Sequence, residues 1–67
     1  MTSVREEVTL GILIALRAEG ELRLHFPIAL RNGLTRGELE EVVYHATAYA
    51  GFPAASTAGR IGQEVLG

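Results

Sequence analysis

The 67-residue sequence contains no cysteine, and this absence excludes several classes of protein. A disulfide scaffold, a zinc finger, an iron–sulfur site and thiol redox chemistry all need a cysteine sulfur. A chain of this size buries only about 60% of the surface that its unfolded form exposes. Small domains therefore often add disulfides, metals or association, and here the disulfide route is closed.

Lysine is also absent, and the six arginines are scattered through a chain of net charge −2. Binding of nucleic acid needs a dense basic stripe, so we expect no nucleic-acid partner. The longest strongly apolar run, Leu10 to Leu16, is far shorter than the roughly 20 residues of a membrane span. The N-terminus lacks the pattern of a signal peptide. We expect no membrane association and a cytoplasmic location.

Apolar residues are abundant instead: they make up 48% of the chain, whose mean hydropathy is +0.21 and whose mass is 7.2 kDa. The thin core of so small a domain rarely supplies more than about 3–5 kcal/mol. Much of this apolar surface therefore has to be covered by other chains, and we expect a homo-oligomer.

The apolar residues recur at three- and four-residue spacing, and no segment shows sustained alternation. This pattern predicts an all-α fold, a small bundle of about four helices in a single domain spanning 1–67. The expected helices cover residues 4–18, 21–32, 36–50 and 53–65. Their apolar stripes predict a buried set: Val8, Ile12, Leu16, Leu30, Leu39, Val42, Val43, Ala46 and Ile61.

Local signals mark the expected helix ends. Ser3 with Glu6, and Thr35 with Glu38, have the spacing of a capping box. Glu19-Gly20 is expected to separate the first two helices. Pro27 implies either a kink in the second helix or a start of that helix near Phe26.

The clearest chemical pair is Glu21 with His25, four residues apart and therefore on one helix face. A carboxylate beside an imidazole orients the ring and suits it to acid–base chemistry, although a plain surface ion pair has the same spacing. Glu6 is in turn compatible with a role at the helix N-terminus, where negative charge is favourable. A metal site from Glu21, His25 and His45 is disfavoured, because no ligand motif is present. Each arginine is more consistent with a solvated surface position than with a substrate carboxylate.

Several stretches give the chain a resemblance to the carboxymuconolactone decarboxylase family, of the alkylhydroperoxidase D-like superfamily. They span nearly the whole sequence: Arg5-Glu6, Glu21-Leu22-Arg23-Leu24-His25, Ala29-Leu30-Arg31-Asn32-Gly33-Leu34-Thr35, Glu41-Val42-Val43-Tyr44-His45 and Tyr49-Ala50-Gly51-Phe52-Pro53-Ala54-Ala55. The match is with the later part of the family domain. The resemblance implies oligomers, trimers or hexamers, with the His25 region near a subunit interface.

Thiol members of the superfamily carry a glutamate followed by Cys-x-x-Cys-x-x-x-His. When His25 is aligned with that histidine, Glu21 replaces the second cysteine, Ala18 lies near the first, and Glu6 matches the leading glutamate. The chain therefore resembles the cysteine-free decarboxylase branch, for which thiol peroxidase chemistry is excluded.

The resemblance implies cofactor-free decarboxylation of a carboxylated lactone in aromatic-acid catabolism. His25 would supply a proton or stabilise an oxyanion, and Glu21 or Glu6 would orient it. The alternative is a non-catalytic oligomeric or binding member that keeps the helical core. Convergence of the three residues in a partly buried site would favour the enzyme, and their scatter over open surface would favour the alternative.

Overall fold

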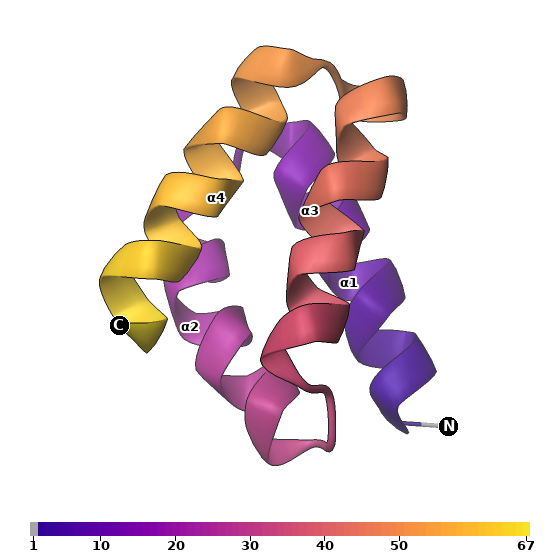
Figure 1. Ribbon diagram of the computed structural model, residues 1–67, viewed down its shortest axis with the longest axis vertical. Helices are drawn as coiled ribbons and strands as arrows, with labels where there is room; N and C mark the ends of the chain where they lie inside the picture. The colour runs from indigo at the N-terminus through magenta and orange to yellow at the C-terminus, as the bar shows by residue number, and fades with distance from the viewer. Residues whose placement is uncertain (1) are drawn as a thin grey trace.

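The computed structural model describes residues 2–67, which form four helices and no strand. Helix α1 covers Thr2–Leu16, α2 covers Glu19–Arg31, α3 covers Arg36–Ala50 and α4 covers Phe52–Leu66 (Figure 1). The helices pack α1 on α2, α2 on α4, α4 on α3 and α3 on α1. The prediction of an all-α bundle of four helices is confirmed. None of these helices is long and apolar enough to cross a bilayer.

The core lies where the four helices meet. Its largest fully buried side chains are Phe26, Leu10, Ile14, Leu22 and Ile61. Small residues of α4 complete it, because Ala54, Ala55 and Ala58 let α4 approach the other helices closely. An added Cβ at Gly62 would lie 3.7 Å from the Phe26 ring, so this glycine lets the ring pack on the α4 backbone.

The capping box at the start of α3 is present as predicted. The Glu38 amide donates to Thr35 Oγ1 at 3.1 Å, and the Thr35 amide donates to Glu38 Oε1 at 2.8 Å. Both bonds satisfy amides that the first turn of a helix leaves without partners. The prediction of a cap at Ser3 is wrong, because α1 begins at Thr2 and Ser3 lies inside it.

The break between α1 and α2 is at Arg17-Ala18 and not at Glu19-Gly20. The Arg17 amide donates to the Ile14 carbonyl and the Ala18 amide to the Leu13 carbonyl, both at 3.0 Å. This pattern is a Schellman motif, which closes a helix through a residue of positive φ. Glu19 is therefore free to occupy the first turn of α2, where a carboxylate interacts favourably with the helix dipole.

Helix α2 continues through Pro27, so of the two alternatives for this helix a start near Phe26 does not hold. Its C-terminus is a second Schellman motif, in which Gly33 has a φ of 104°. The Gly33 amide bonds to Leu30 and the Leu34 amide to Ala29, each at 3.1 Å.

The burial predicted from the apolar stripes is right for part of the set only. Leu39 and Ile61 are buried, and Leu30, Val42, Val43 and Ala46 pack against the core while partly exposed. Val8, Ile12 and Leu16 are exposed in the single chain, so their prediction is wrong at this level. The reason is geometric: α1 buries Leu10 and Ile14 against the other helices, with Leu13 packed beside them, while Val8, Ile12 and Leu16 lie on another side of the helix.

Candidate active site

The hairpin of α1 and α2 places Glu6 beside His25. The two helices pack against each other and are joined by a turn of two residues, Arg17 and Ala18, so the chain reverses direction there. Glu6 precedes the turn by eleven residues, while His25 and Asn32 follow it by seven and fourteen. Because the rise per residue is equal in both helices, Glu6 lies at a level between His25 and Asn32.

The imidazole of His25 lies between two carboxylates. Its Nδ1 is 3.7 Å from Glu6 Oε1, and its Nε2 is 3.7 Å from Glu21 Oε2. The structure therefore brings together all three residues predicted for the site, Glu6 from α1 with Glu21 and His25 from α2. A protonated ring in this position has an acceptor facing each of its N–H groups, at distances that a small side-chain rotation shortens to a hydrogen bond.

Asn32 is a fourth member of the group that the sequence analysis did not identify. Its Nδ2 donates to Glu6 Oε2 at 3.2 Å, which leaves Oε1 of the same carboxylate directed at His25. The signal was present in the sequence, because Asn32 follows His25 by seven residues, two helical turns, and so shares its face. From the sequence, Asn32 is expected only to be the last residue of the helix over residues 21–32.

Burial differs between the two sides of the imidazole. The Glu6 side chain is 14% exposed and that of His25 28%, whereas Glu21 is 59% exposed. Glu6 Oε1 and His25 Nδ1 are fully shielded, and neither has a hydrogen-bond partner among the described residues. Buried polar atoms are nearly always satisfied, and these two atoms face each other at 3.7 Å, just beyond hydrogen-bond distance. The Nε2 side is the side open to solvent.

His45 lies away from this group. It is exposed on α3, with its ring centroid 4.9 Å from that of Tyr49. It lines a groove of about 760 Å³ between α1 and α3, together with Glu7 and Glu41. Within residues 2–67 no three histidine, aspartate or glutamate side chains are placed to hold a metal ion together, so Glu21, His25 and His45 do not form a cluster.

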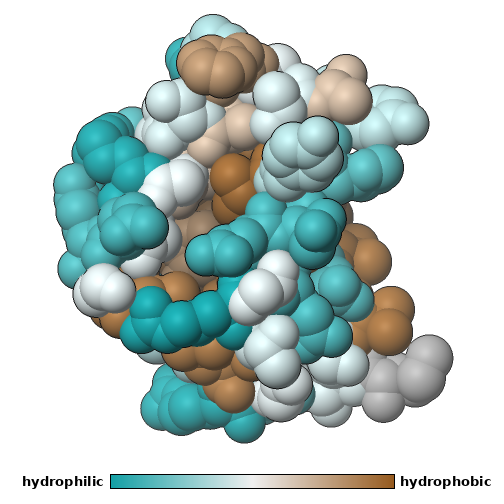
Figure 2. All heavy atoms as spheres, in the orientation of Figure 1, coloured by the Kyte–Doolittle hydropathy of each residue, from teal (hydrophilic) through white to brown (hydrophobic). Residues whose placement is uncertain are grey.

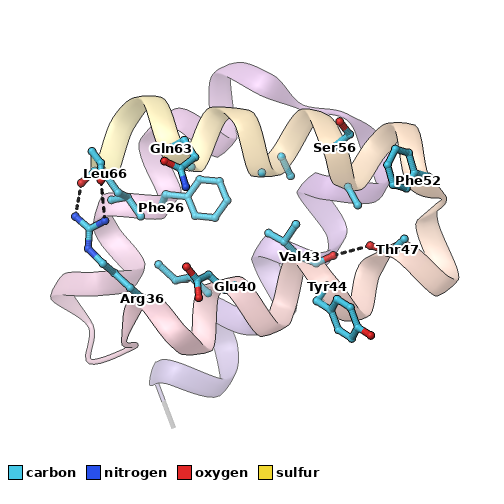
Figure 3. Close-up of a pocket in the computed structure, with 16 residues that line it drawn as sticks. Phe26, Arg36, Glu40, Val43, Tyr44, Thr47, Phe52, Ser56, Gln63 and Leu66 are labelled. Atoms are coloured by element: carbon cyan, nitrogen blue, oxygen red, sulfur yellow. Dashed lines mark hydrogen bonds between the residues drawn. The ribbon is translucent and has the colours of Figure 1, made fainter.

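A second groove, of about 380 Å³, runs between α3 and α4 (Figure 3). Leu39, Val43, Ala55 and Ala58 are among its apolar lining residues. Arg36 and Gln63 lie at one end of it and Thr47 at the other, as Figure 3 shows. The space-filling view shows this hollow with an apolar floor (Figure 2). Glu6, Glu21, His25 and Asn32 line neither this groove nor the one between α1 and α3.

Three of the arginines have partners within the fold. Arg23 pairs with Glu64 at 2.8 Å, which ties α2 to α4, and Arg60 pairs with the same carboxylate at 3.2 Å within α4. Arg36 donates to the carbonyls of Leu66 and Gly67 at the end of α4 (Figure 3). All three side chains are exposed, which agrees with the solvated surface positions expected for individual arginines.

Comparisons with known proteins agree with the sequence motifs. The family model of the carboxymuconolactone decarboxylase family matches residues 2–64. A 4-carboxymuconolactone decarboxylase from Acinetobacter baylyi is 43% identical over 62 residues, 92% of this chain and 46% of the relative. The nitrosuccinic acid decarboxylase npaB from Metarhizium robertsii is 39% identical over 62 residues, 92% of this chain and 43% of the relative. No solved structure gives a significant match.

The chain thus spans about half the length of the curated relatives that it matches. The matched half includes the whole group of Glu6, Glu21, His25 and Asn32, since residues 2–64 fall within the family model. Both relatives are named as decarboxylases.

Proposed function

Because this chain belongs to the carboxymuconolactone decarboxylase family, we propose that it removes CO2 from a small carboxylated lactone without a cofactor, as a step in aromatic-acid catabolism. The observation that carries the proposal is the His25 imidazole held between the Glu6 and Glu21 carboxylates on the hairpin of α1 and α2. Such an arrangement suits a group that gives up a proton and regains it.

The reaction needs one proton at carbon. When the bond between the substrate carbon and its carboxylate breaks, CO2 leaves and the electron pair stays behind, delocalised onto the conjugated lactone carbonyl. A proton on a carbon of this conjugated system completes the product. One carboxylate and one proton are consumed, and one C–H bond and one CO2 are formed. No nucleophile is required, and the absence of cysteine is no obstacle.

Glu6 and Glu21 have different roles in this proposal because their side chains are unequally buried. Glu6, shielded and fixed by Asn32, faces Nδ1 and holds the ring orientation. Nε2 lies on the exposed side and is the atom from which the proton moves to substrate. Glu21, more exposed, is placed to accept an N–H from the resting ring and to yield that position when substrate binds. Solvent then returns the proton to His25.

The names of the two relatives narrow the substrate class. A carboxymuconolactone and nitrosuccinic acid share carboxyl groups and a second group that takes up an electron pair, a lactone or a nitro group. The lactone is favoured for this chain because both the family description and the relative at 43% identity name it. Nitrosuccinic acid is therefore assayed beside the lactone as a second candidate substrate.

The test is CO2 release from 4-carboxymuconolactone and from nitrosuccinic acid by the purified chain. We expect turnover of the lactone, and His25→Gln is expected to lower kcat by about 10²–10⁴-fold because it removes the transferable proton. The chain offers a matched control, since His45→Gln makes the same change outside the site and should leave kcat unchanged. Equal rates for His25→Gln and the unchanged protein would refute these roles.

A second candidate function is a non-catalytic oligomeric or binding member of the family. One observation supports it: the residues of the His25 group line neither groove, so neither groove would hold a substrate against His25. If the folded chain binds but never converts either acid, this alternative replaces the enzyme.

A further inference from the structure

Asn32 lies at the end of α2, but its side chain is not needed for the turn that follows. Asparagine is common at helix ends because it tolerates a positive φ. Here Asn32 has a φ of −90°, which any residue adopts, and the positive φ of 104° belongs to Gly33. The side-chain amide of Asn32 therefore serves a different contact, and that contact is with Glu6 of α1.

The backbone fixes the position of this amide group. The Asn32 N–H donates to the Ile28 carbonyl at 2.9 Å, which holds Asn32 as the C-cap of α2. From there Nδ2 donates to Glu6 Oε2 at 3.2 Å, across the contact of α1 with α2. The amide of asparagine is neutral, so it holds one carboxylate oxygen without cancelling the negative charge, as the cation of an ion pair would. Glu6 keeps that charge for His25.

The second oxygen of Glu6 determines which form of the imidazole fits the site. Glu6 Oε1 and His25 Nδ1 are shielded from solvent, lie 3.7 Å apart and have no hydrogen-bond partner among residues 2–67. If Nδ1 carried a lone pair, two acceptors would face each other and neither would reach water. If Nδ1 carries a proton, a donor faces an acceptor, and a small rotation pairs both. Buried polar atoms without partners are costly, so a proton on Nδ1 is strongly favoured.

The other ring nitrogen is not constrained in this way. Nε2 faces Glu21, whose side chain is 59% exposed, so water can pair with Nε2 whether or not it carries a proton. An exposed carboxylate attracts an N–H less strongly than a shielded one, because water raises the local dielectric constant. Glu6 therefore outweighs Glu21, although each carboxylate lies 3.7 Å from a nitrogen of the ring.

We propose that Asn32 is a positioning residue that sets the tautomer of His25. By holding Glu6 Oε2, it keeps Oε1 at the shielded nitrogen, so neutral His25 carries its proton on Nδ1 and its lone pair on Nε2. Nε2 is then the one nitrogen that exchanges a proton with substrate or solvent. The catalytic meaning of this inference rests on the proposed function, whereas the tautomer is a property of the folded chain and is measured without substrate.

The nitrogen NMR chemical shifts of the imidazole test this inference, because they differ widely between a nitrogen with a proton and one with a lone pair. The chain has two histidines, so His45→Gln assigns the spectrum. At a pH where both rings are neutral, we expect His25 to be the Nδ1–H form. His45, exposed on α3, should show mainly the Nε2–H form that free histidine favours in water.

Two substitutions remove the amide donor in different ways. Asn32→Asp keeps the shape of the side chain and replaces the donor by an acceptor, and Asn32→Ala removes the group. Each should lower the ratio of the Nδ1–H form to the Nε2–H form of His25 by about tenfold, the effect of one ordinary hydrogen bond. Circular dichroism should still show a helical fold, because Asn32 is exposed.

Gln63→Glu is the matched control for Asn32→Asp. It makes the same change from amide to carboxylate at an exposed position of α4, in the groove between α3 and α4 and outside the His25 group. This variant should leave the tautomer of His25 unchanged. A His25 ring that is mainly Nε2–H in the unchanged chain would overturn the inference, and so would an unchanged tautomer in both Asn32 variants.

The inference and the proposed function can fail separately. If the tautomer depends on Asn32 but neither acid is decarboxylated, the inference stands and the proposed function falls. If the chain is active, Asn32→Ala should lower kcat about tenfold with little change in KM, in step with the tautomer. The reason is that a ring with its lone pair on the shielded nitrogen regains the catalytic proton slowly. An unchanged kcat in an active Asn32→Ala would overturn the positioning role.

Discussion

Arg17 is the non-glycine residue with a positive φ among those described, at 55°. It closes α1 in the position that glycine occupies at the end of α2, where Gly33 has the equivalent role. A left-handed conformation is disfavoured by about 1–2 kcal/mol for a residue with a Cβ. The turn that sets the α1–α2 hairpin, and with it the distance from Glu6 to His25, therefore includes a strained residue.

We expect Arg17→Gly to raise the free energy of unfolding by about 1 kcal/mol, because glycine adopts this φ without a Cβ clash. Urea denaturation measures the difference. Arg31→Gly is the control: Arg31 lies in the last turn of α2, so the same chemical change there should lower stability by about 0.5–1 kcal/mol. Equal signs for the two variants would contradict the prediction.

The role of a single residue could be predicted where the sequence pattern that indicates it lies within a few neighbouring residues. The Thr35–Glu38 capping box depends on four consecutive residues and formed as predicted. Ser3 has the same local pattern, but α1 begins before it. The spacing of Asn32 from His25 indicates a shared face, but the carboxylate that Asn32 contacts is 26 positions away and is not part of any local pattern.

The helix pair of α2 and α4 is joined by surface charges. Glu64 accepts a hydrogen bond from Arg23, and this bond, with further attraction from Arg23 and Arg60, lowers the pKa of the carboxyl below its ordinary value of 4.5. A carboxyl whose pKa is lower in the folded than in the unfolded chain stabilises the fold at pH values above the pKa that it has in the unfolded chain. This stabilisation is lost as the pH falls through the lower pKa that the carboxyl has in the folded chain.

Glu64→Gln should accordingly be less stable than the unchanged chain at pH 7 and indistinguishable from it once the pH is well below 4.5. Urea midpoints at a series of pH values provide the measurement. Glu40→Gln serves as the control, since the structure describes no ion pair for Glu40. A difference between Glu64→Gln and the unchanged chain that persists in acid would argue against the ion pair as its origin.

The number of helices was predicted correctly from the periodicity of apolar residues, whereas the residues at which the helices end were predicted less well. The α1–α2 break could not be predicted, because the residue that makes it is an arginine and not the glycine that usually marks such a turn. Pro27 left two alternatives, and the structure has one continuous α2 whose buried residues Leu22 and Phe26 precede Pro27 and whose buried Ala29 follows it.

Few side chains of the molecule are fully buried, so each of them contributes a large share of the free energy of unfolding. A chain of this length has about 3–10 kcal/mol in total. Ile61→Ala leaves a cavity at a fully buried position and should cost about 2–5 kcal/mol, enough to unfold much of the population. Thermal melts followed by circular dichroism measure this, with exposed Leu24→Ala expected to change stability by less than about 0.5 kcal/mol.

At the scale of the whole molecule, the apolar stripes predicted more burial than the single chain provides. The exposed residues Val8, Ile12 and Leu16 of α1 have the spacing of a core face, and periodicity alone does not reveal which of two apolar faces meets the rest of its own chain. The convergence of Glu6, Glu21 and His25 was anticipated through resemblance to a family and not from spacing, which related only Glu21 to His25.

The brevity of the connections has a consequence for folding kinetics. Two residues join α1 to α2, four join α2 to α3, and Gly51 alone joins α3 to α4. Loop closure between neighbouring helices is then fast, and helical domains with local topology fold in microseconds to milliseconds. Formation of the monomer should therefore be a single rapid phase. Any slower phase whose rate rises with protein concentration would report the encounter of two folded copies.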